Sequence, residues 1–263
     1  MTKTDKGTQR KLQITWILLL LTLHISAQNI FEPVKSSKVL SKMDTYVEKA
    51  MGYQIDIQAL YKKINNGKSL QMTVPVFDEN KNIVLNKVNI LTEDYTLFTE
   101  SKKIANTAAK YAFYHGHVEG KSDSKVSLTI YDGKLQLSIF DSDGDFEINH
   151  SSEQLYSGHF RRDLISQDTY LWDCSSENLK SKVIKSGSNK SLQSNECVSI
   201  FLEIDKAMYV KKGSSISATE EWALTIMNQV SILYMEWDVP LNISGMQIWT
   251  TDDPYITAAN TGQ

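Results

Sequence analysis

Histidine and cysteine are the residues of this 263-residue chain whose chemistry would be easiest to recognise, because both bind zinc and cysteine also forms disulfides. The five histidines are His24, His115, His117, His150 and His159. No two of them are four residues apart, as the two zinc ligands of an H-E-x-x-H helix would be. The sequence therefore contains no complete zinc site, and we assign no catalytic or metal-binding residue in it.

His115 and His117 stand two residues apart in a predicted strand, so both side chains would point to one face of a sheet. A shared metal would need further ligands, which the neighbouring sequence does not provide. A surface or packing role is the simpler interpretation of the pair.

The two cysteines, Cys174 and Cys197, are too few for a disulfide framework and do not have C-x-x-C spacing. If they pair with each other, the disulfide would stabilise the fold by about 3 kcal/mol. Two free thiols, or pairing with a cysteine further downstream, are the alternatives.

The first 27 residues have the three-part layout of a secretory signal peptide. Four basic residues precede an apolar run from Ile14 to Leu23, and Ser26-Ala27 supplies the small residues of a cleavage site. This run is shorter than the roughly 20 residues that span a bilayer, so we expect no stable membrane insertion. The mature chain is expected to begin near Gln28 and to be secreted or otherwise extracytoplasmic, with an uncleaved tether as the alternative.

Composition indicates a folded soluble protein, with 41% hydrophobic and 22% charged residues and a formal net charge of −3. The basic residues are scattered and form no stripe that would neutralise phosphates. We therefore expect no nucleic-acid partner.

Hydrophobic periodicity favours a helix within residues 38–66 and then changes to a period of two. Leu70 to Val76 alternate as a strand, which Pro75 restricts to a sheet edge. A polar turn leads into a second extended stretch, Ile83–Leu91, which completes a hairpin.

Between Tyr114 and Ile148, short alternating stretches are joined by turns at Asp132-Gly133 and Asp141–Asp145, which predicts an antiparallel sheet. The second turn has the D-x-D-x-D start of a calcium loop but lacks the spaced glutamate that completes one. We therefore interpret it as a solvated hairpin turn.

Residues 175–195 are rich in Ser, Lys and Asn and poor in large apolar groups, which is typical of a linker. Such segments are also where proteases cut most readily, so we expect one part to be released from the other here. The dibasic pair Arg161-Arg162 is a less favoured processing point.

The segment after Cys197 predicts a β–α–β unit with two parallel strands. Val198 to Ile204 alternate as a largely buried strand, and Ser217 and Glu220 have capping-box spacing at the start of a helix. The second strand changes parity, so we expect a bulge near Gly245. The expected apolar face of the helix carries Ala223, Ile226, Met227, Val230, Leu233 and Tyr234.

Two stretches resemble the precursors of reprolysin-like (adamalysin-type, metzincin) zinc metalloproteases. Tyr114-His115-Gly116-His117-Val118-Glu119-Gly120, followed by Val126-Ser127-Leu128 and Asp132-Gly133, resembles the core of the family's propeptide. The segment from Val198 through Asp205 and Met208-Tyr209 to Ile248-Trp249-Thr250 is similar to the first β–α–β unit of the catalytic domain.

The resemblance implies an α+β protein with an antiparallel, β-rich propeptide followed by the first β–α–β unit of an α/β metzincin-type domain. The implied parts are a signal peptide (1–27), a propeptide domain (28–174), a linker (175–195) and an incomplete catalytic segment (196–263). The implied function is that of a secreted zinc metalloendopeptidase precursor acting on protein or peptide substrates, in which an intramolecular contact lets the propeptide inhibit and chaperone the catalytic domain.

The sequence departs from the family at the places where catalysis would occur. Family members carry H-E-x-x-H-x-x-G-x-x-H, which this chain lacks, so we expect the chain as given to be inactive. Cys174 could act as the zinc-binding cysteine of a family propeptide, but Ser175 follows it where the family motif has glycine. Ser199 stands where some relatives have a calcium-binding glutamate, so no calcium site is inferred. A non-catalytic binding or inhibitor module is the alternative function, and a β-sheet cell-surface protein is a third.

Overall fold

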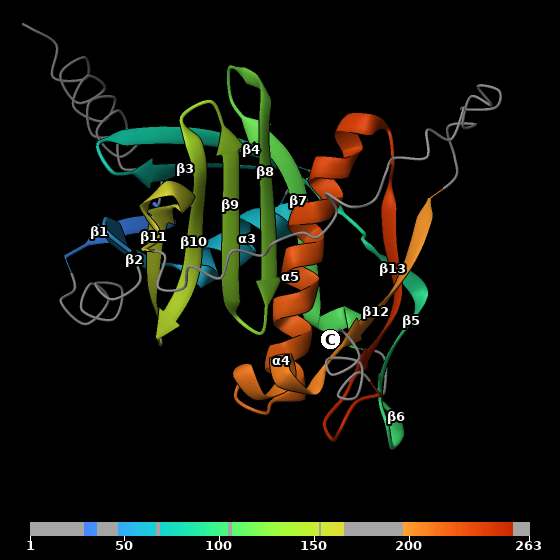
Figure 1. Cartoon of the computed structure of the whole chain (residues 1–263). Helices are drawn as coiled ribbons and strands as arrows, with labels where there is room; N and C mark the ends of the chain where they lie inside the picture. The colour runs from blue at the N-terminus through green and yellow to red at the C-terminus, as the bar shows by residue number, and fades with distance from the viewer. Residues whose placement is uncertain are drawn as a thin grey trace, which may run out of the picture.

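The computed structural model describes residues 29–35, 47–66, 69–104, 107–152, 154–165 and 197–254. They form a large and a small β-sheet with one long helix between them (Figure 1). The helices are α3 Ile57–Asn66, α4 Lys206–Lys211 and α5 Ile216–Tyr234, with short 3₁₀ segments at Ala108–Lys110, Arg161–Asp163 and Met235–Trp237. No helix among these residues is both long and apolar enough to cross a bilayer.

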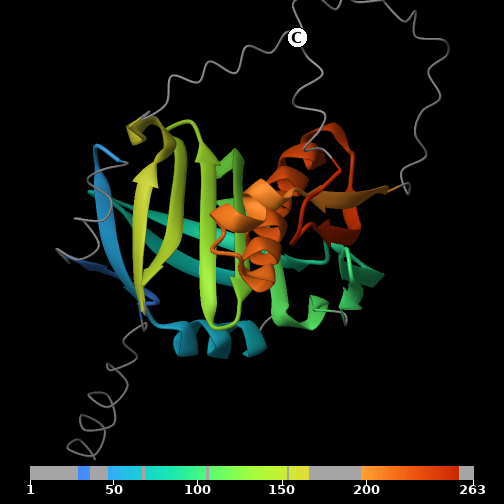
Figure 2. The ribbon, with the colours of Figure 1, turned by 60° about the horizontal axis from the view of Figure 1, so that its bottom comes forward.

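The large sheet has nine strands in the order β1-β2-β11-β10-β9-β8-β7-β4-β3. Their bounds are β1 Phe31–Val34, β2 Ala50–Ile55, β3 Ser69–Val76, β4 Glu79–Val88, β7 Tyr111–Val118, β8 Lys121–Tyr131, β9 Lys134–Asp141, β10 Gly144–Ser152 and β11 Leu155–Phe160. Every neighbouring pair is antiparallel, which confirms the antiparallel sheet predicted for this region. The two edge strands, β1 and β3, also contact each other, so the sheet curls nearly into a barrel. Helix α3 covers one open end of it (Figure 2).

The hairpins of the large sheet follow from their turn residues. Asp132 and Gly133 both have positive φ, 45° and 73°, which is the two-residue turn that best joins twisted antiparallel strands. Strand β3, which contains Pro75, lies at the sheet edge, as Pro75 predicts. The predicted β3–β4 hairpin is confirmed, but β4 ends at Val88 and Leu91 begins a strand of the other sheet.

The small sheet has the order β12-β13-β5-β6, with β12 Val198–Ile204, β13 Leu241–Ile248, β5 Leu91–Thr99 and β6 Lys102–Ile104. Strands β12, β13 and β5 run parallel, and β12–α5–β13 is the predicted β–α–β unit. The expected bulge is confirmed, because Ile200 pairs with Ile243 and Phe201 with Gly245, which leaves Ser244 as the extra residue. Strands β5 and β6 come from the β-rich region, as we call the described residues from 29 to 165, whereas β12 and β13 follow residue 197. Both halves of the chain therefore build this sheet.

Three predictions about single elements were wrong. Residues 50–55, placed within the predicted helix 38–66, form strand β2, because Tyr53 and Ile55 alternate with exposed Gln54 and fill the large-sheet core. Strand β12 has no fully buried residue, because it lies at the edge of its sheet. Helix α5 is capped by Ser215, whose side chain accepts from the Ala218 N–H, and not by Ser217.

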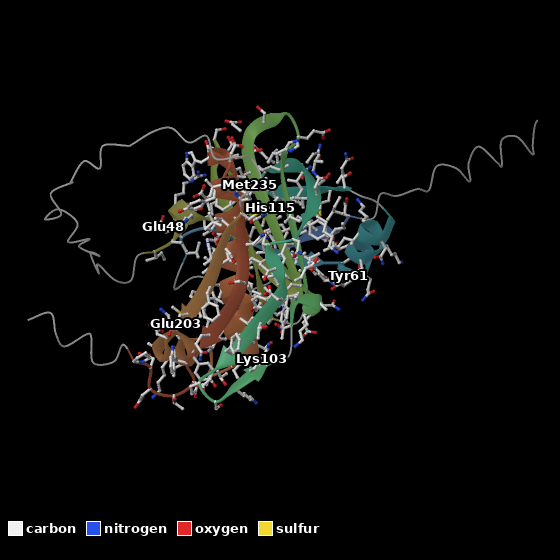
Figure 3. The ribbon with its side chains drawn as sticks, turned by 90° about the vertical axis from the view of Figure 1, so that its right-hand side faces the viewer. Glu48, Tyr61, Lys103, His115, Glu203 and Met235 are labelled. Carbon is white, nitrogen blue, oxygen red and sulfur yellow. The ribbon has the colours of Figure 1, made fainter. Side chains whose placement is uncertain are left out.

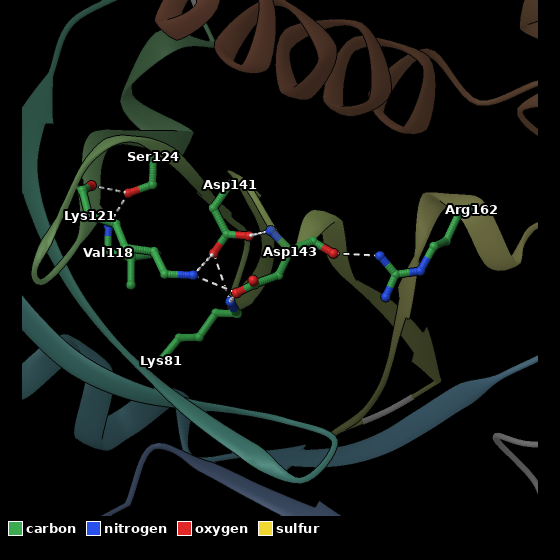
Figure 4. Close-up of polar contacts among 7 residues, drawn as sticks. All are labelled: Lys81, Val118, Lys121, Ser124, Asp141, Asp143 and Arg162. Carbon is green, nitrogen blue, oxygen red and sulfur yellow. Dashed lines mark hydrogen bonds and ion pairs between the residues drawn. The ribbon is translucent and has the colours of Figure 1, made fainter.

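A cluster of charged side chains holds the Asp141–Asp145 turn (Figure 4). Lys81 Nζ lies 2.7 Å from a carboxylate oxygen of both Asp141 and Asp143, and Lys121 also pairs with both carboxylates. The side chains of Lys81 and Asp141 are only 5% and 1% exposed. The hairpin turn is confirmed, but Asp141 is buried and not solvated, and two ammonium groups supply the positive charge that a calcium loop would take from its ion.

We expect Lys81→Met to destabilise the protein by about 3 kcal/mol, because it leaves the buried Asp141 carboxylate with only the longer ion pair to Lys121. Urea unfolding would measure the loss. Lys125→Met is the matched control, because it breaks a pair with Glu236, whose side chain is 60% exposed, and should cost less than about 1 kcal/mol. Equal losses in the two variants would contradict the assignment of a buried cluster.

Candidate functional site: the contact between helix α5 and the two sheets

Helix α5 lies between the large and the small sheet and packs on β8 and β13 (Figures 1 and 2). The residues buried around it come from both halves of the chain. They are Ile90, Leu91, Tyr95, Leu97, Tyr111, Phe113, Tyr131, Ala223, Leu224, Ile243, Met246 and Ile248. This second core is separate from the one inside the large sheet, and it joins residues 197–254 to the β-rich region.

Polar residues of α5 are buried in this contact together with the apolar ones. Glu220 is 1% exposed, and its carboxylate accepts hydrogen bonds from Tyr95 Oη at 2.9 Å and from the hydroxyl of Thr107. No lysine or arginine among the described residues pairs with it. Burying a carboxylate without hydrogen-bond donors lowers the stability of a fold, so these two hydroxyl groups are needed to stabilise Glu220 in its buried position.

The phenols near Glu220 respond to its charge. Burial and then the charge of Glu220 raise the pKa of Tyr95 well above its ordinary value, and the same two causes raise the pKa of Tyr111. Both phenols therefore stay protonated at any physiological pH, so Tyr95 remains a hydrogen-bond donor to the carboxylate.

Asn228, two turns further along α5, is fully buried and bonds to two strands of the β-rich region, β7 and β8. Its Nδ2 donates to Leu128 O at 3.2 Å and to Thr129 Oγ1 at 3.0 Å, so its Oδ1 must be the acceptor for His115 Nε2 at 2.9 Å. His115 then carries its proton on Nε2. Its Nδ1 is buried and has no hydrogen-bond partner among the described residues.

Further contacts anchor both ends of the helix. Ser217 hydrogen-bonds to Tyr131, and Gln229 Nε2 donates to Ser138 Oγ at 2.7 Å. At the C-terminal end, Glu236 pairs with Lys125 at 3.1 Å. Figure 3 shows His115 toward the same end of the molecule as Met235, with Lys103 and Glu203 toward the other end.

Acid is expected to destabilise the folded protein. Burial lowers the pKa of His115 below 6.5 against the opposing effect of Asn228, and burial also lowers the pKa of His159. Each histidine thus binds fewer protons in the folded than in the unfolded state. Its contribution to the free energy of unfolding is therefore complete above pH 6.5, and it falls as the pH drops from 6.5 toward the lowered pKa of the folded state. Unfolding in urea between about pH 5 and 7.5 would show this slope.

His115→Gln should reduce the slope of the free energy of unfolding against pH, because it removes one of the two histidines whose pKa is lowered by burial. His117→Gln is the control, since His117 is exposed. An unchanged slope in His115→Gln would contradict the role given to His115.

The predicted site residues lie apart. His115 is buried against Asn228, whereas His117 is exposed next to a register shift in β7, so the structure does not bring the two together as metal ligands. Cys197 is exposed, and Cys174 lies outside the described residues, so the disulfide and the zinc switch both stay untested predictions. No group of three His, Cys, Asp or Glu residues within the described ranges could hold a metal ion.

The sequence pattern missed the buried face of α5. Ile226 and Tyr234, predicted on the apolar face, are 37% and 43% exposed. The buried residues are Thr219, Glu220, Ala223, Leu224, Thr225, Asn228, Ser231 and Ile232. Nothing in the helix sequence marks Glu220 and Asn228, because they stand next to the equally polar Glu221 and Gln229. Their partners lie about a hundred residues earlier in the chain.

The contact can bind and hold a helix, but the part of it that the structure describes contains no arrangement of a nucleophile, a base and an electrophile. Comparison with solved structures gives a chain titled "Structure of a chaperone-substrate complex", with a TM-score of 0.33 and 11% identity over 52% of this chain and 89% of that chain. That likeness is too low to indicate a shared fold. The comparison with protein families matches residues 196–262 to the Reprolysin (M12B) family zinc metalloprotease, and the β-rich region before them fits a propeptide-like part. Residues 196–262 therefore belong to the reprolysin (M12B) family of zinc metalloproteases.

Proposed function

We propose that this chain is part of a secreted zinc metalloendopeptidase precursor, in which the β-rich region chaperones and inhibits the reprolysin segment. The single observation that carries the proposal is the burial of α5 and β13 against residues 91–131 of the β-rich region. A region that supplies both a neighbouring strand and the hydrogen-bond partners of buried polar groups would help the segment to fold. Secretion is supported by the signal-peptide layout of residues 1–27, which lie outside the described residues.

Zinc is implied by the family, but the described residues do not fit it. His115 and His159 are buried in packing roles on β7 and β11, and no third ligand is near either one. A zinc-bound water would attack the peptide bond of the substrate in a family catalytic domain.

We expect purified residues 28–263 to hydrolyse no peptide, because they contain neither the three-histidine motif nor its general base. Casein or gelatin turnover with and without added zinc measures this. Turnover that depends on zinc and disappears with a chelator would contradict the prediction.

The alternative is a propeptide-like binding or inhibitor module without catalysis, which the same contact would also allow. Sequencing the transcript distinguishes the two. A frame that continues into a three-histidine zinc motif supports the precursor, and a stop codon directly after residue 263 supports the binding module.

A further inference from the structure

Strand β5 of the β-rich region extends the sheet of the reprolysin segment through main-chain pairing. Gly245, Met246, Gln247 and Ile248 of β13 pair in parallel with Thr96, Leu97, Phe98 and Thr99 of β5. Hydrogen bonds between β13 and β5, along what we call the seam, use backbone groups, which every strand has. Strand addition alone therefore cannot distinguish the correct partner from another sheet edge.

The polar residues of α5 can make that distinction. The β-rich groups that meet Glu220 and Asn228 are themselves buried, because Tyr95, Thr107, His115 and Thr129 are 0%, 8%, 7% and 3% exposed. Apolar residues at these two places would leave Tyr95, Thr107 and Thr129 without these partners, and His115 Nε2 would keep only the main-chain carbonyl oxygen of residue 228 at 3.2 Å. Leaving a buried polar group unsatisfied costs more than a hydrogen bond contributes. Discrimination by unsatisfied polar groups is a recognised source of specificity.

A third requirement lies on β13, where the two strands approach closely. A Cβ atom at Gly245 would lie 2.9 Å from Thr96 O and 2.8 Å from the ring of Phe201. A larger residue would have to displace β5 or Phe201, so the seam accepts only a strand with glycine at this position.

From these observations we infer that Glu220 and Asn228 determine which partner the β-rich region accepts. That partner is a strand–helix–strand unit whose helix presents a carboxylate and, eight positions later, a carboxamide. Tyr95 and Thr107 hydrogen-bond to the carboxylate. His115, Thr129 and the carbonyl oxygen of Leu128 hydrogen-bond to the carboxamide. The inference rests on the proposed function, in which the β-rich region holds the reprolysin segment.

The test uses the full chain with a site-specific protease sequence inserted between residues 175 and 195. After cutting, dilution followed by native mass spectrometry measures the dissociation constant of the two pieces. Asn228→Leu and Glu220→Leu should each weaken association about tenfold or more, because each leaves buried partners unsatisfied. Ile226→Leu, a change at a 37% exposed position of the same helix, is the matched control and should leave the constant unchanged.

Two further variants separate recognition from a general loss of packing. Glu220→Gln keeps an oxygen acceptor for Tyr95 and Thr107 and should retain most of the affinity, whereas Asn228→Asp loses the donor to Leu128 O and should not. His115→Leu combined with Asn228→Leu should bind more tightly than the two single effects predict, because both partners become apolar.

Pieces that separate in the unmutated chain, single variants that bind normally, or strictly additive double variants would each overturn the inference. None of these results would alter the reading frame that tests the proposed function. Conversely, the expected changes in association, measured in a chain whose reading frame stops after residue 263, would support the inference and reject the protease precursor.

Discussion

Residues 197–263 produced alone are expected to be unfolded or aggregated, while residues 28–174 fold by themselves. In the intact chain the small sheet depends on β5 and β6, which lie at residues 91–104. Of the twelve residues that the structure describes as buried in the core around α5, seven also come from before residue 132. Without them, about 67 residues would have one parallel strand pair and a helix, which bury too little apolar surface to offset chain entropy.

The measurement is a thermal melt with tryptophan emission. Trp222 and Trp249 are partly buried in the intact chain and report on packing, whereas Trp237 is 66% exposed and reports little. A cooperative transition with blue-shifted emission from residues 197–263 would refute the prediction. Residues 28–174 are expected to keep the large-sheet core and to melt cooperatively, because none of that core's buried residues within the described ranges lies after Phe160.

Gly116→Ala is expected to destabilise the protein by about 3 kcal/mol or more. A Cβ atom at this position would overlap the carbonyl oxygen of Val84 and lie 2.9 Å from Leu85 Cα, both backbone atoms of the neighbouring strand β4. Backbone in the middle of a sheet cannot move aside without breaking the β4–β7 ladder. This explains physically why a glycine stands between His115 and His117.

Gly120→Ala, four residues further along, is the matched control for Gly116→Ala. Gly120 has a φ of 80° and nothing within 4 Å of the added Cβ, so only backbone strain of about 1–2 kcal/mol is expected. Chemical denaturation compares the two variants directly. If Gly116→Ala loses no more stability than Gly120→Ala, the close approach of β7 and β4 is wrong.

Local pattern in the sequence was sufficient for most elements of this protein. The alternation of residues 198–204 and 241–248, the turn at Asp132-Gly133 and the parity change at Gly245 each depend on neighbours within a few positions. These features predicted the antiparallel sheet, the parallel β–α–β unit and its bulge, whereas the resemblance to reprolysins rested on the particular residues of two stretches, 114–133 and 198–250.

Tertiary structure decided everything that depends on partners far apart in the chain. Met51 continues the near-helical spacing of the apolar residues before it, yet residues 50–55 are a strand because pairing with β1 and β11 outweighs local propensity. Glu220 and Asn228 are buried because Tyr95, Thr107 and His115 lie opposite them, and no periodicity in α5 encodes those partners. The sequence by itself determined which segments alternate and where they turn, and only the fold decided that β5 leaves the large sheet to join β13, because strand pairing is a contact between distant segments.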